Sequence, residues 1–331
     1  MKDLTETQKF GKTDLVTTPI VYGCMGGAGA FGAQEESDSI DALRAAFDVG
    51  INFFDTAEAY GGGYSEQLLQ RALGDKRSEI VISSKVGREN LAPEKVIEAC
   101  ERSLENLGTD HIDLYMLHWP NRDVPLPDSI GALKTLKEQG KIRWYGVSNF
   151  GSKDIGEARD LGEISVNQLP YHLFFRAIEF EVQPKCEAAG VPIMCYSSLM
   201  QGLLAGKYKS LNDFPADRAR TRMFDHRKWS EAVHKEDGAE EAGQELLDAL
   251  WNLVDETGLT MEELAIGWLK SRPAVGGVIV GTRNGEQSRG LKKLLDVELD
   301  TAVLQKLSEA SDRLKQELGA DTDMWGKGRT R

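Results

Sequence analysis

The chain has few cysteines, four among 331 residues. Cys24, Cys100, Cys186 and Cys195 form no C-x-x-C pair and no spacing typical of a zinc finger. Each lies among apolar residues, which favours packing in a core over a disulfide framework. We therefore predict no metal site and a reducing compartment, the cytoplasm.

Long apolar runs and basic residues are also scarce. No run of about 18 consecutive apolar residues occurs, so no membrane span is predicted. The first ten residues, MKDLTETQKF, lack the apolar stretch of a signal peptide. The 40 Lys and Arg residues against 53 Asp and Glu give a net charge of −13. Such an acidic chain is a poor candidate for binding nucleic acid or an anionic membrane. The sequence does not indicate an oligomeric state.

What the chain does contain is a repeat of short apolar strands, each followed by a helical pattern. The predicted strands are residues 20–23, 52–55, 80–86, 112–118, 142–148, 165–168, 192–197 and 277–281. Strands that alternate with helices predict βα repeats and a parallel sheet. Eight repeats predict a closed (β/α)8 TIM barrel in one domain, residues 1–331, with an open doubly wound sheet as the alternative. Residues 9–18 predict a small hairpin that caps the barrel floor.

One long polar excursion, about residues 205–245, separates the seventh strand from the eighth. Between Lys207 and Lys235 it holds eight Lys and Arg residues against four Asp and Glu. This excess of positive charge is unusual in an acidic chain. The excursion is either a solvated loop or a lid over an anionic ligand, since loops of this length are often lids.

Polar residues mark the carboxyl ends of the predicted strands, where a (β/α)8 barrel carries its chemistry. They are Asp55 with Tyr60 on the loop beyond, Lys85, His118, Ser148, Asn149, Gln168, Tyr196, Gly281, Thr282 and Arg283. Each residue alone has an ordinary structural role, such as an ion pair or a helix cap. An Asp, a Tyr, a Lys and a His at three successive strand mouths would be costly to bury without a purpose.

These four residues suit the reduction of a carbonyl group. A carbonyl that receives a hydride also needs a proton on its oxygen, which Tyr60 can supply. The Lys85 ammonium would stabilise the phenolate and lower the pKa of the phenol, while Asp55 keeps the lysine charged and in place. His118 can hydrogen-bond the carbonyl oxygen and orient it. The glycines at 61–63 let the backbone turn back, so that Tyr60 leans inward.

The sequence resembles the aldo-keto reductase family along nearly its whole length. GINFFDTAEAYGGGYSEQLLQRAL resembles the family signature G-x-x-x-x-D-T-A-x-x-Y-G. ISSKVG, IDLYMLHWP, GKIRWYGVSNF, VNQLPYH and YSSLMQGLLAGKY resemble further family segments, in the family order. The resemblance implies a (β/α)8 barrel that binds NADPH across its mouth and reduces aldehydes and ketones. It also implies Tyr60 as proton donor, Lys85 and Asp55 as its tuning pair, and His118 as the residue that orients the carbonyl.

The resemblance further implies the contacts of an NADP(H) cofactor. Ser148, Asn149 and Gln168 would contact the nicotinamide amide, Tyr196 would stack on its ring, and Met25 and Gly26 would lie beside it. The lid would cover the pyrophosphate with Ser197, Leu199, Gly202, Leu204, Gly206, Lys207 and Arg218. Gly281, Thr282, Arg283 and Gln287 would hold the adenosine 2′-phosphate. Gly290 and Leu291 replace the Glu and Asn with which many members contact adenine.

Three other interpretations compete with this one. GAGAFG at residues 27–32 matches G-x-G-x-x-G, but the polar AQEESD that follows predicts a loop rather than a Rossmann helix. Lys85 could instead be the Schiff-base nucleophile of a barrel aldolase. The chain could also be a cofactor-sensing regulatory subunit with slow turnover, although the complete Asp-Tyr-Lys-His set favours an enzyme.

The substrate is predicted only as a small carbonyl or alcohol. Trp119, Phe31 and Met200 are the candidates for the walls of its pocket. The polar neighbours Gln201, Asn121 and Arg122 are compatible with a polyol, a sugar or a small hydroxy-aldehyde, and they do not select one.

Overall fold

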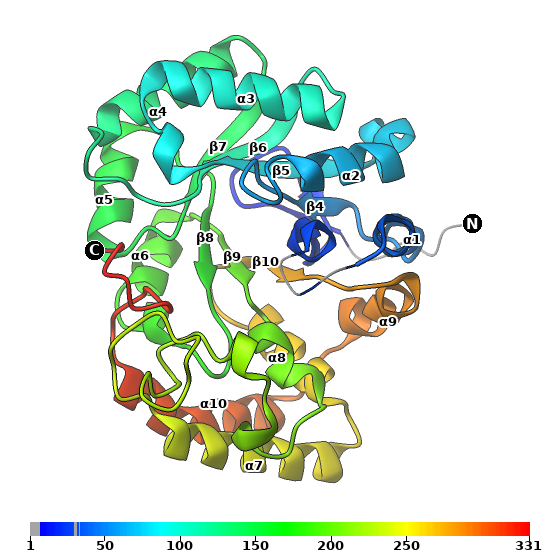
Figure 1. Ribbon diagram of the computed structural model, residues 1–331, viewed down its shortest axis with the longest axis vertical. Coiled ribbons are helices and arrows are strands. Elements are labelled where there is room, and N and C mark those ends of the chain that lie inside the picture. The colour runs from blue at the N-terminus through cyan, green and yellow to red at the C-terminus, as the bar shows by residue number, and fades with distance from the viewer. Residues whose placement is uncertain (1–6, 30–31, 33) are drawn as a thin grey trace.

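The computed structural model describes residues 7–29, 32 and 34–331. Eight parallel strands close into a barrel in the order β10-β3-β4-β5-β6-β7-β8-β9 (Figure 1). The strands are β3 (Ile20–Gly23), β4 (Phe53–Asp55), β5 (Val81–Val86), β6 (Ile112–Leu117), β7 (Ile142–Ser148), β8 (Asn167–Pro170), β9 (Ile193–Tyr196) and β10 (Val275–Val280). The closed barrel confirms the predicted fold class, and the open doubly wound sheet is excluded.

Helices follow the strands around the outside of the barrel. They are α1 (Glu36–Asp48), α2 (Tyr64–Leu73), α3 (Pro93–Leu107), α4 (Leu126–Glu138), α5 (Ser152–Leu161), α6 (Val182–Ala189), α8 (Met261–Lys270) and α9 (Gly285–Asp296). Two further helices, α7 (Glu240–Thr257) and α10 (Thr301–Leu318), pack against each other outside this ring. α3 shows how the sequence sets its ends, because Pro93 occupies the first turn and Gly108 ends the helix at a left-handed φ of 59°.

The barrel interior is a packed apolar core that is closed at one end. Its side chains are Phe10, Leu15, Val21, Phe53, Val81, Leu114, Met116, Val166 and Met194. Phe10 and Leu15 come from the hairpin of β1 (Gln8–Lys9) and β2 (Val16–Thr17), which covers the floor. The Phe10 ring meets the Phe53 ring edge-on, with centroids 5.5 Å apart. Polar groups therefore gather at the opposite end, where the strands finish.

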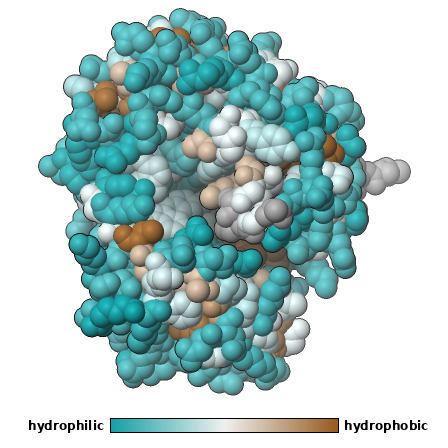
Figure 2. All heavy atoms as spheres, in the orientation of Figure 1, coloured by the Kyte–Doolittle hydropathy of each residue, from teal (hydrophilic) through white to brown (hydrophobic). Residues whose placement is uncertain are grey.

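Two irregular segments cover part of that opposite end. The lid, residues 197–239, follows β9 and contains only short 3-10 turns. It ends where α7 begins at Glu240, which is earlier than the predicted end of the excursion at 245. The tail, residues 319–331, leaves α10, passes beside the lid and ends near α5 (Figure 1). Figure 2 shows that hydrophilic residues cover most of this face and that it is hollowed near its centre. No helix among the described residues is long and apolar enough to cross a bilayer.

Candidate active site

A buried ion pair lies at the ends of β4 and β5. Lys85 Nζ donates to Asp55 Oδ2 at 2.7 Å and to the Thr56 carbonyl oxygen at 2.7 Å. The same nitrogen lies 3.5 Å from the Tyr60 phenol oxygen. Burial alone would lower the pKa of Lys85, but the Asp55 carboxylate and the Tyr60 phenol raise it above its ordinary value. Lys85 is thus a charged donor directly beside the tyrosine.

The strand register explains why Asp55 is held so firmly. Asp55 pairs with Ser83 across β4 and β5, and Lys85 is two residues further on the same face of β5. Ser83 Oγ donates to Asp55 Oδ1 at 2.6 Å, and Gln168 Nε2 donates to the same oxygen at 3.0 Å. The sequence did not single out Ser83, although alternation along β5 would have found it. Gln168, predicted to contact the cofactor, donates its amide to the carboxylate.

Three glycines turn the chain so that Tyr60 faces the lysine. Gly61, Gly62 and Gly63 have φ values of 63°, 62° and 92°, which L side chains rarely adopt. The Lys85 ammonium then lies 5.1 Å from the centroid of the Tyr60 ring. Burial raises the pKa of Tyr60, and Lys85 lowers it only in part, so the net direction is upward. The predicted effect of the lysine is confirmed, since Lys85 lowers the pKa of Tyr60, but burial outweighs the ammonium. The phenol is protonated at neutral pH and can give a proton away.

His118 completes the set at the end of β6. Its ring stands nearly perpendicular to the Tyr60 ring, with centroids 5.7 Å apart. Burial, with help from the charges of Lys85 and Arg329, lowers the pKa of His118 to about 3. A neutral imidazole in this position can donate an N–H to a carbonyl oxygen. The structure thus brings together all four residues that the sequence predicts to be catalytic.

A second polar network connects the ends of β7 and β9. Asn149 has a left-handed φ of 62°, and its Nδ2 donates to the His118 carbonyl oxygen and to Ser148 Oγ, both at 3.0 Å. Tyr196 Oη donates to Asn149 Oδ1 at 2.8 Å. Ser148, Asn149 and Tyr196 therefore gather at the mouth, and the network fixes the loop that carries His118. Their contacts to a nicotinamide stay a prediction.

The lid holds buried donors that lack a protein partner. Gln201 Nε2, Arg218 Nε and Arg220 Nε are buried and make no hydrogen bond with the described residues, and the same is true of the Thr221 hydroxyl. Buried polar groups are nearly always paired, so three such donors on one segment fit an anionic group such as a pyrophosphate. The sequence predicts Arg218 in this role, names Gln201 only as a pocket neighbour, and gives Arg220 no role.

The turn at the start of the lid has an unusual backbone. Ser197, Met200 and Gln201 have φ values of 54°, 47° and 53°. The backbone N–H groups of Gly202 and Leu204 both donate to the Leu199 carbonyl oxygen, at 2.9 Å and 3.1 Å. The turn ends at Gly206, and Lys207 beyond it is exposed. Strained backbone of this kind is common where a ligand is clamped.

The end of β10 leads into the positive end of a helix dipole. Gln287 Oε1 accepts from the Arg283 backbone N–H at 2.9 Å, and Asn284 caps α9 by accepting from the Gln287 N–H at 2.9 Å. A helix N-terminus with an arginine beside it is suited to a phosphate. Thr282 is engaged within the protein, since its hydroxyl lies 2.6 Å from Ser288 Oγ and 3.1 Å from Tyr22 Oη.

The remaining residues predicted to contact the cofactor or the substrate lie partly at the surface and partly in the core. Met25 and Gly26 lie in a 3-10 helix after β3, and Met25 is 41% exposed. Gly281 is exposed at the end of β10. Met200 is only 1% exposed and packs in the apolar core, so it lines no open space in this structure. Phe31 lies outside the described residues.

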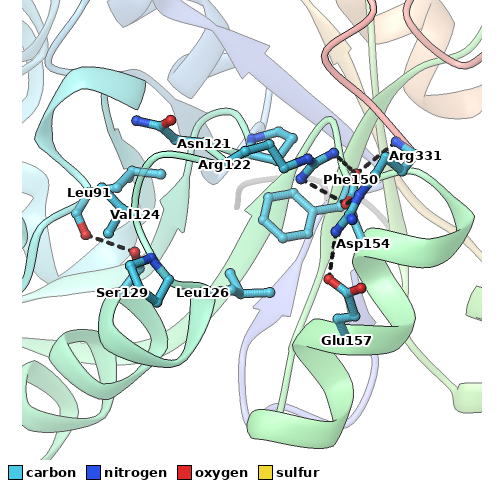
Figure 3. Close-up of a pocket in the computed structure, with 12 residues that line it drawn as sticks. Leu91, Asn121, Arg122, Val124, Leu126, Ser129, Phe150, Asp154, Glu157 and Arg331 are labelled. Carbon is cyan, nitrogen blue, oxygen red and sulfur yellow. Dashed lines mark hydrogen bonds and ion pairs between the residues drawn. The ribbon is translucent and has the colours of Figure 1, made fainter.

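The tail reaches the site, although the sequence gives it no role. The Arg329 guanidinium carbon lies 3.4 Å above the centroid of the Trp119 ring. The tail is anchored at α5, where Asp154 accepts from Arg331 Nε at 2.9 Å and from Arg122 Nη1 at 2.9 Å (Figure 3). These groups border a cavity of about 180 Å³ between α4 and α5. Trp119, predicted as a pocket wall, is therefore covered by the tail.

Arg222 joins the lid to the tail. Its Nη1 and Nη2 donate to the carbonyl oxygens of Asp321 and Leu318 at 2.9 Å and 3.0 Å. Its backbone N–H donates to the Met324 carbonyl oxygen at 3.0 Å, and its Nε donates to the Glu236 carboxylate at 2.8 Å. The two irregular segments are thus one connected cover over the mouth.

Comparison with known proteins agrees with this arrangement. The model of the Aldo/keto reductase family matches residues 19–312. Aldo-keto reductase YhdN of Bacillus subtilis (strain 168) is 31% identical over 280 residues, which are 81% of this chain and 82% of that protein. The NADH-specific methylglyoxal reductase of Escherichia coli (strain K12) is 29% identical over 92% of this chain and 98% of its own length.

A solved structure has the same fold. The aldo-keto reductase from Klebsiella pneumoniae in complex with NADPH has a TM-score of 0.73 and 28% identity, and the match covers 92% of this chain and 95% of that one. The family model spans all eight barrel strands and the four residues at their mouth. Because the family model matches residues 19–312, the chain belongs to the aldo/keto reductase family.

Proposed function

We propose that the protein reduces an aldehyde or ketone to an alcohol and prefers NADPH over NADH as the hydride source. The observation that carries the proposal is the placement of Lys85. Its ammonium is held by Asp55 and the Thr56 carbonyl oxygen and lies 3.5 Å from the Tyr60 oxygen. That arrangement suits a phenol that must lose a proton during the reaction.

The roles of the residues follow from their charges. When bound, an NADPH cofactor would supply the hydride for the carbonyl carbon. Tyr60 gives its proton to the carbonyl oxygen, and the resulting phenolate is stabilised by the Lys85 ammonium until solvent reprotonates it. The neutral His118 donates a hydrogen bond to the same oxygen and orients it. Asp55 keeps Lys85 charged, and oxidation of an alcohol uses the same groups in reverse.

Separate groups would hold the two phosphate regions of the cofactor. The buried donors of Gln201, Arg218 and Arg220 would take the pyrophosphate, because they make no hydrogen bond with the described residues. Arg283 and the N-terminus of α9 would take the 2′-phosphate, which NADH lacks. The relatives differ in cofactor, since one is named as NADH-specific and one solved structure holds NADPH. The preference for NADPH therefore rests on Arg283.

The alternatives are less well supported. A Schiff-base lysine must be neutral to attack a carbonyl, whereas Lys85 has a raised pKa and donates to two oxygens. A regulatory subunit that senses the cofactor would not need the complete set of Asp55, Tyr60, Lys85 and His118. A reducing cytoplasm stays our prediction for the compartment, since all four cysteines are buried and free.

The experiment is steady-state oxidation of NADPH with a panel of small aldehydes, ketones and hydroxy-aldehydes. Turnover with at least one carbonyl compound is the expected result. Tight binding of NADPH without turnover across the whole panel would contradict the proposal and favour the regulatory subunit.

A further inference from the structure

Arg329 is a charged residue beside the site that the proposed mechanism does not use. Its guanidinium carbon lies 3.4 Å above the centroid of the Trp119 ring, the distance of direct stacking. Trp119 follows His118 directly in the chain at the end of β6. The tail thus places a cation over the residue next to the imidazole that orients the carbonyl.

A buried carboxylate fixes this arginine from one edge only. Asp323 is fully buried and accepts the backbone N–H groups of Trp325, Lys327 and Arg329 at 3.2, 3.1 and 3.2 Å. It also accepts from Arg329 Nε at 3.2 Å and Nη2 at 3.1 Å. Nη1 of Arg329 makes no hydrogen bond with the residues that the structure describes. The guanidinium is therefore rigid and keeps donors available.

The charge of Arg329 acts on the site. After burial, the causes that lower the pKa of His118 are the charges of Lys85 and Arg329. The Arg329 side chain is 19% exposed, and a charge partly removed from water acts more strongly on its neighbours. At this side of the mouth the Arg329 guanidinium is paired with the Asp323 carboxylate at 3.1 Å, and its charge reaches His118.

We propose that Arg329 determines specificity by favouring carbonyl substrates that carry a carboxylate. The free Nη1 edge would bind the carboxylate while Tyr60 and His118 bind the carbonyl oxygen. A planar guanidinium suits a carboxylate, and its stacking on Trp119 means that little side-chain freedom is lost on binding. This inference rests on the proposed function and narrows its substrate class.

The test compares substrates that differ in charge and little in shape. The first pair is 4-carboxybenzaldehyde and its methyl ester, and the second is 4-oxobutanoate and its methyl ester. kcat/KM is measured with NADPH for the wild type, Arg329→Gln and Arg329→Lys. Arg313→Gln is the control, because Arg313 lies on the outer helix α10 and pairs with Glu241, Glu245 and Glu317.

We expect the wild type to prefer the carboxylate in at least one pair. Arg329→Gln should lower kcat/KM for the carboxylate about 10- to 100-fold, the range of a charged hydrogen bond, and for the ester less than about twofold. Arg329→Lys should restore part of the preference, and added salt should weaken it. The control variant Arg313→Gln should leave kcat/KM unchanged for both the carboxylate and the ester.

Two results would overturn the inference while the proposed function stands. The first is a wild type that reduces both esters as well as both carboxylates. The second is an equal loss for acid and ester in Arg329→Gln with no rescue by lysine, which would make the arginine only a structural part of the tail. A wild type that reduces no aldehyde at all would instead refute the proposed function, and this inference with it.

Discussion

The rim of the barrel mouth and the cover above it are built in different ways. At the rim, Asp55, Lys85 and His118 stand within one residue of the ends of adjacent strands, and backbone pairing sets their spacing. In the cover, the lid and the tail have no strand or α-helix between 197 and 239 or between 319 and 331. Arg222 of the lid holds the two segments together by donating to backbone carbonyl oxygens at the start of the tail. The rim is rigid and suits the chemistry, while the cover can vary and suits selection of the ligand.

The largest effect is expected at the centre of the rim. Lys85→Met should lower kcat by at least about 10³-fold, within the range of general acid catalysis, because nothing then stabilises the phenolate. It should also reduce stability by roughly 3 kcal/mol, since a buried Asp55 carboxylate loses its partner. Asp55→Asn should be milder because the lysine stays charged. NADPH oxidation and thermal unfolding of both variants measure these effects.

The roles of these two residues would have to be exchanged if the lysine variant stayed active and the aspartate variant did not. Borohydride treatment in the presence of substrate gives a separate check. A trapped adduct on Lys85 would support the aldolase instead.

Tyr60→Phe is the second prediction, and it separates chemistry from binding at the rim. The phenyl ring keeps the shape but cannot give a proton. We expect kcat to fall at least about 10²-fold while the Kd for NADPH stays nearly unchanged. Steady-state kinetics and fluorescence titration measure the two quantities. A variant with nearly wild-type turnover would remove Tyr60 from the mechanism.

Arg283→Ala tests the cofactor preference beyond the rim. The variant should bind NADPH roughly 10- to 30-fold more weakly, because one charged contact to the 2′-phosphate is lost. NADH binding should barely change. Arg289→Ala on α9, the helix that follows Arg283, is the matched control, since Arg289 is exposed and lies 3.8 Å from Asp41. Equal losses for both cofactors would mean that Arg283 does not recognise the 2′-phosphate.

Arg222→Met tests whether the cover acts as one unit. Two tail carbonyl oxygens would lose their donors, so we expect KM for the substrate and Kd for NADPH to rise together, about five- to tenfold, with kcat little changed. Arg227→Met is the control in the same lid, because Arg227 is exposed and pairs with Asp225 and Asp237. A loss of kcat as large as that of Tyr60→Phe would break the distinction between rim and cover.

The smallest effect concerns pH. Burial lowers the pKa of His118 and of His172 to about 3, against about 6.5 in an unfolded chain. Between these values the unfolded chain binds more protons, so the free energy of unfolding should fall as pH drops from about 6.5 towards 3. His172 also lies 3.4 Å from Met324 Sδ in the tail. Urea unfolding at several pH values should show a shallower dependence for His172→Asn, and an unchanged one would contradict this.

The same contrast explains what the sequence could predict. The strands, the closed barrel and the convergence of Asp55, Tyr60, Lys85 and His118 follow from apolar periodicity and from short motifs at strand ends. The net direction of the Tyr60 pKa shift does not follow from these patterns, because it depends on burial, which no motif records. The position of the tail could not be predicted from the sequence either. Arg329 and Trp119 are far apart in the chain, and Arg222 binds backbone carbonyl oxygens, which every residue possesses.

The joint at Arg222 has a consequence for protein engineering. A lid taken from a relative would keep this contact only if it placed an arginine opposite the carbonyl oxygens of Leu318 and Asp321. A transplanted tail would leave the guanidinium of Arg222 with only Glu236 as a partner. Grafts that aim to change substrate or cofactor should therefore exchange residues 197–239 and 319–331 together, as a single cassette on an unaltered barrel.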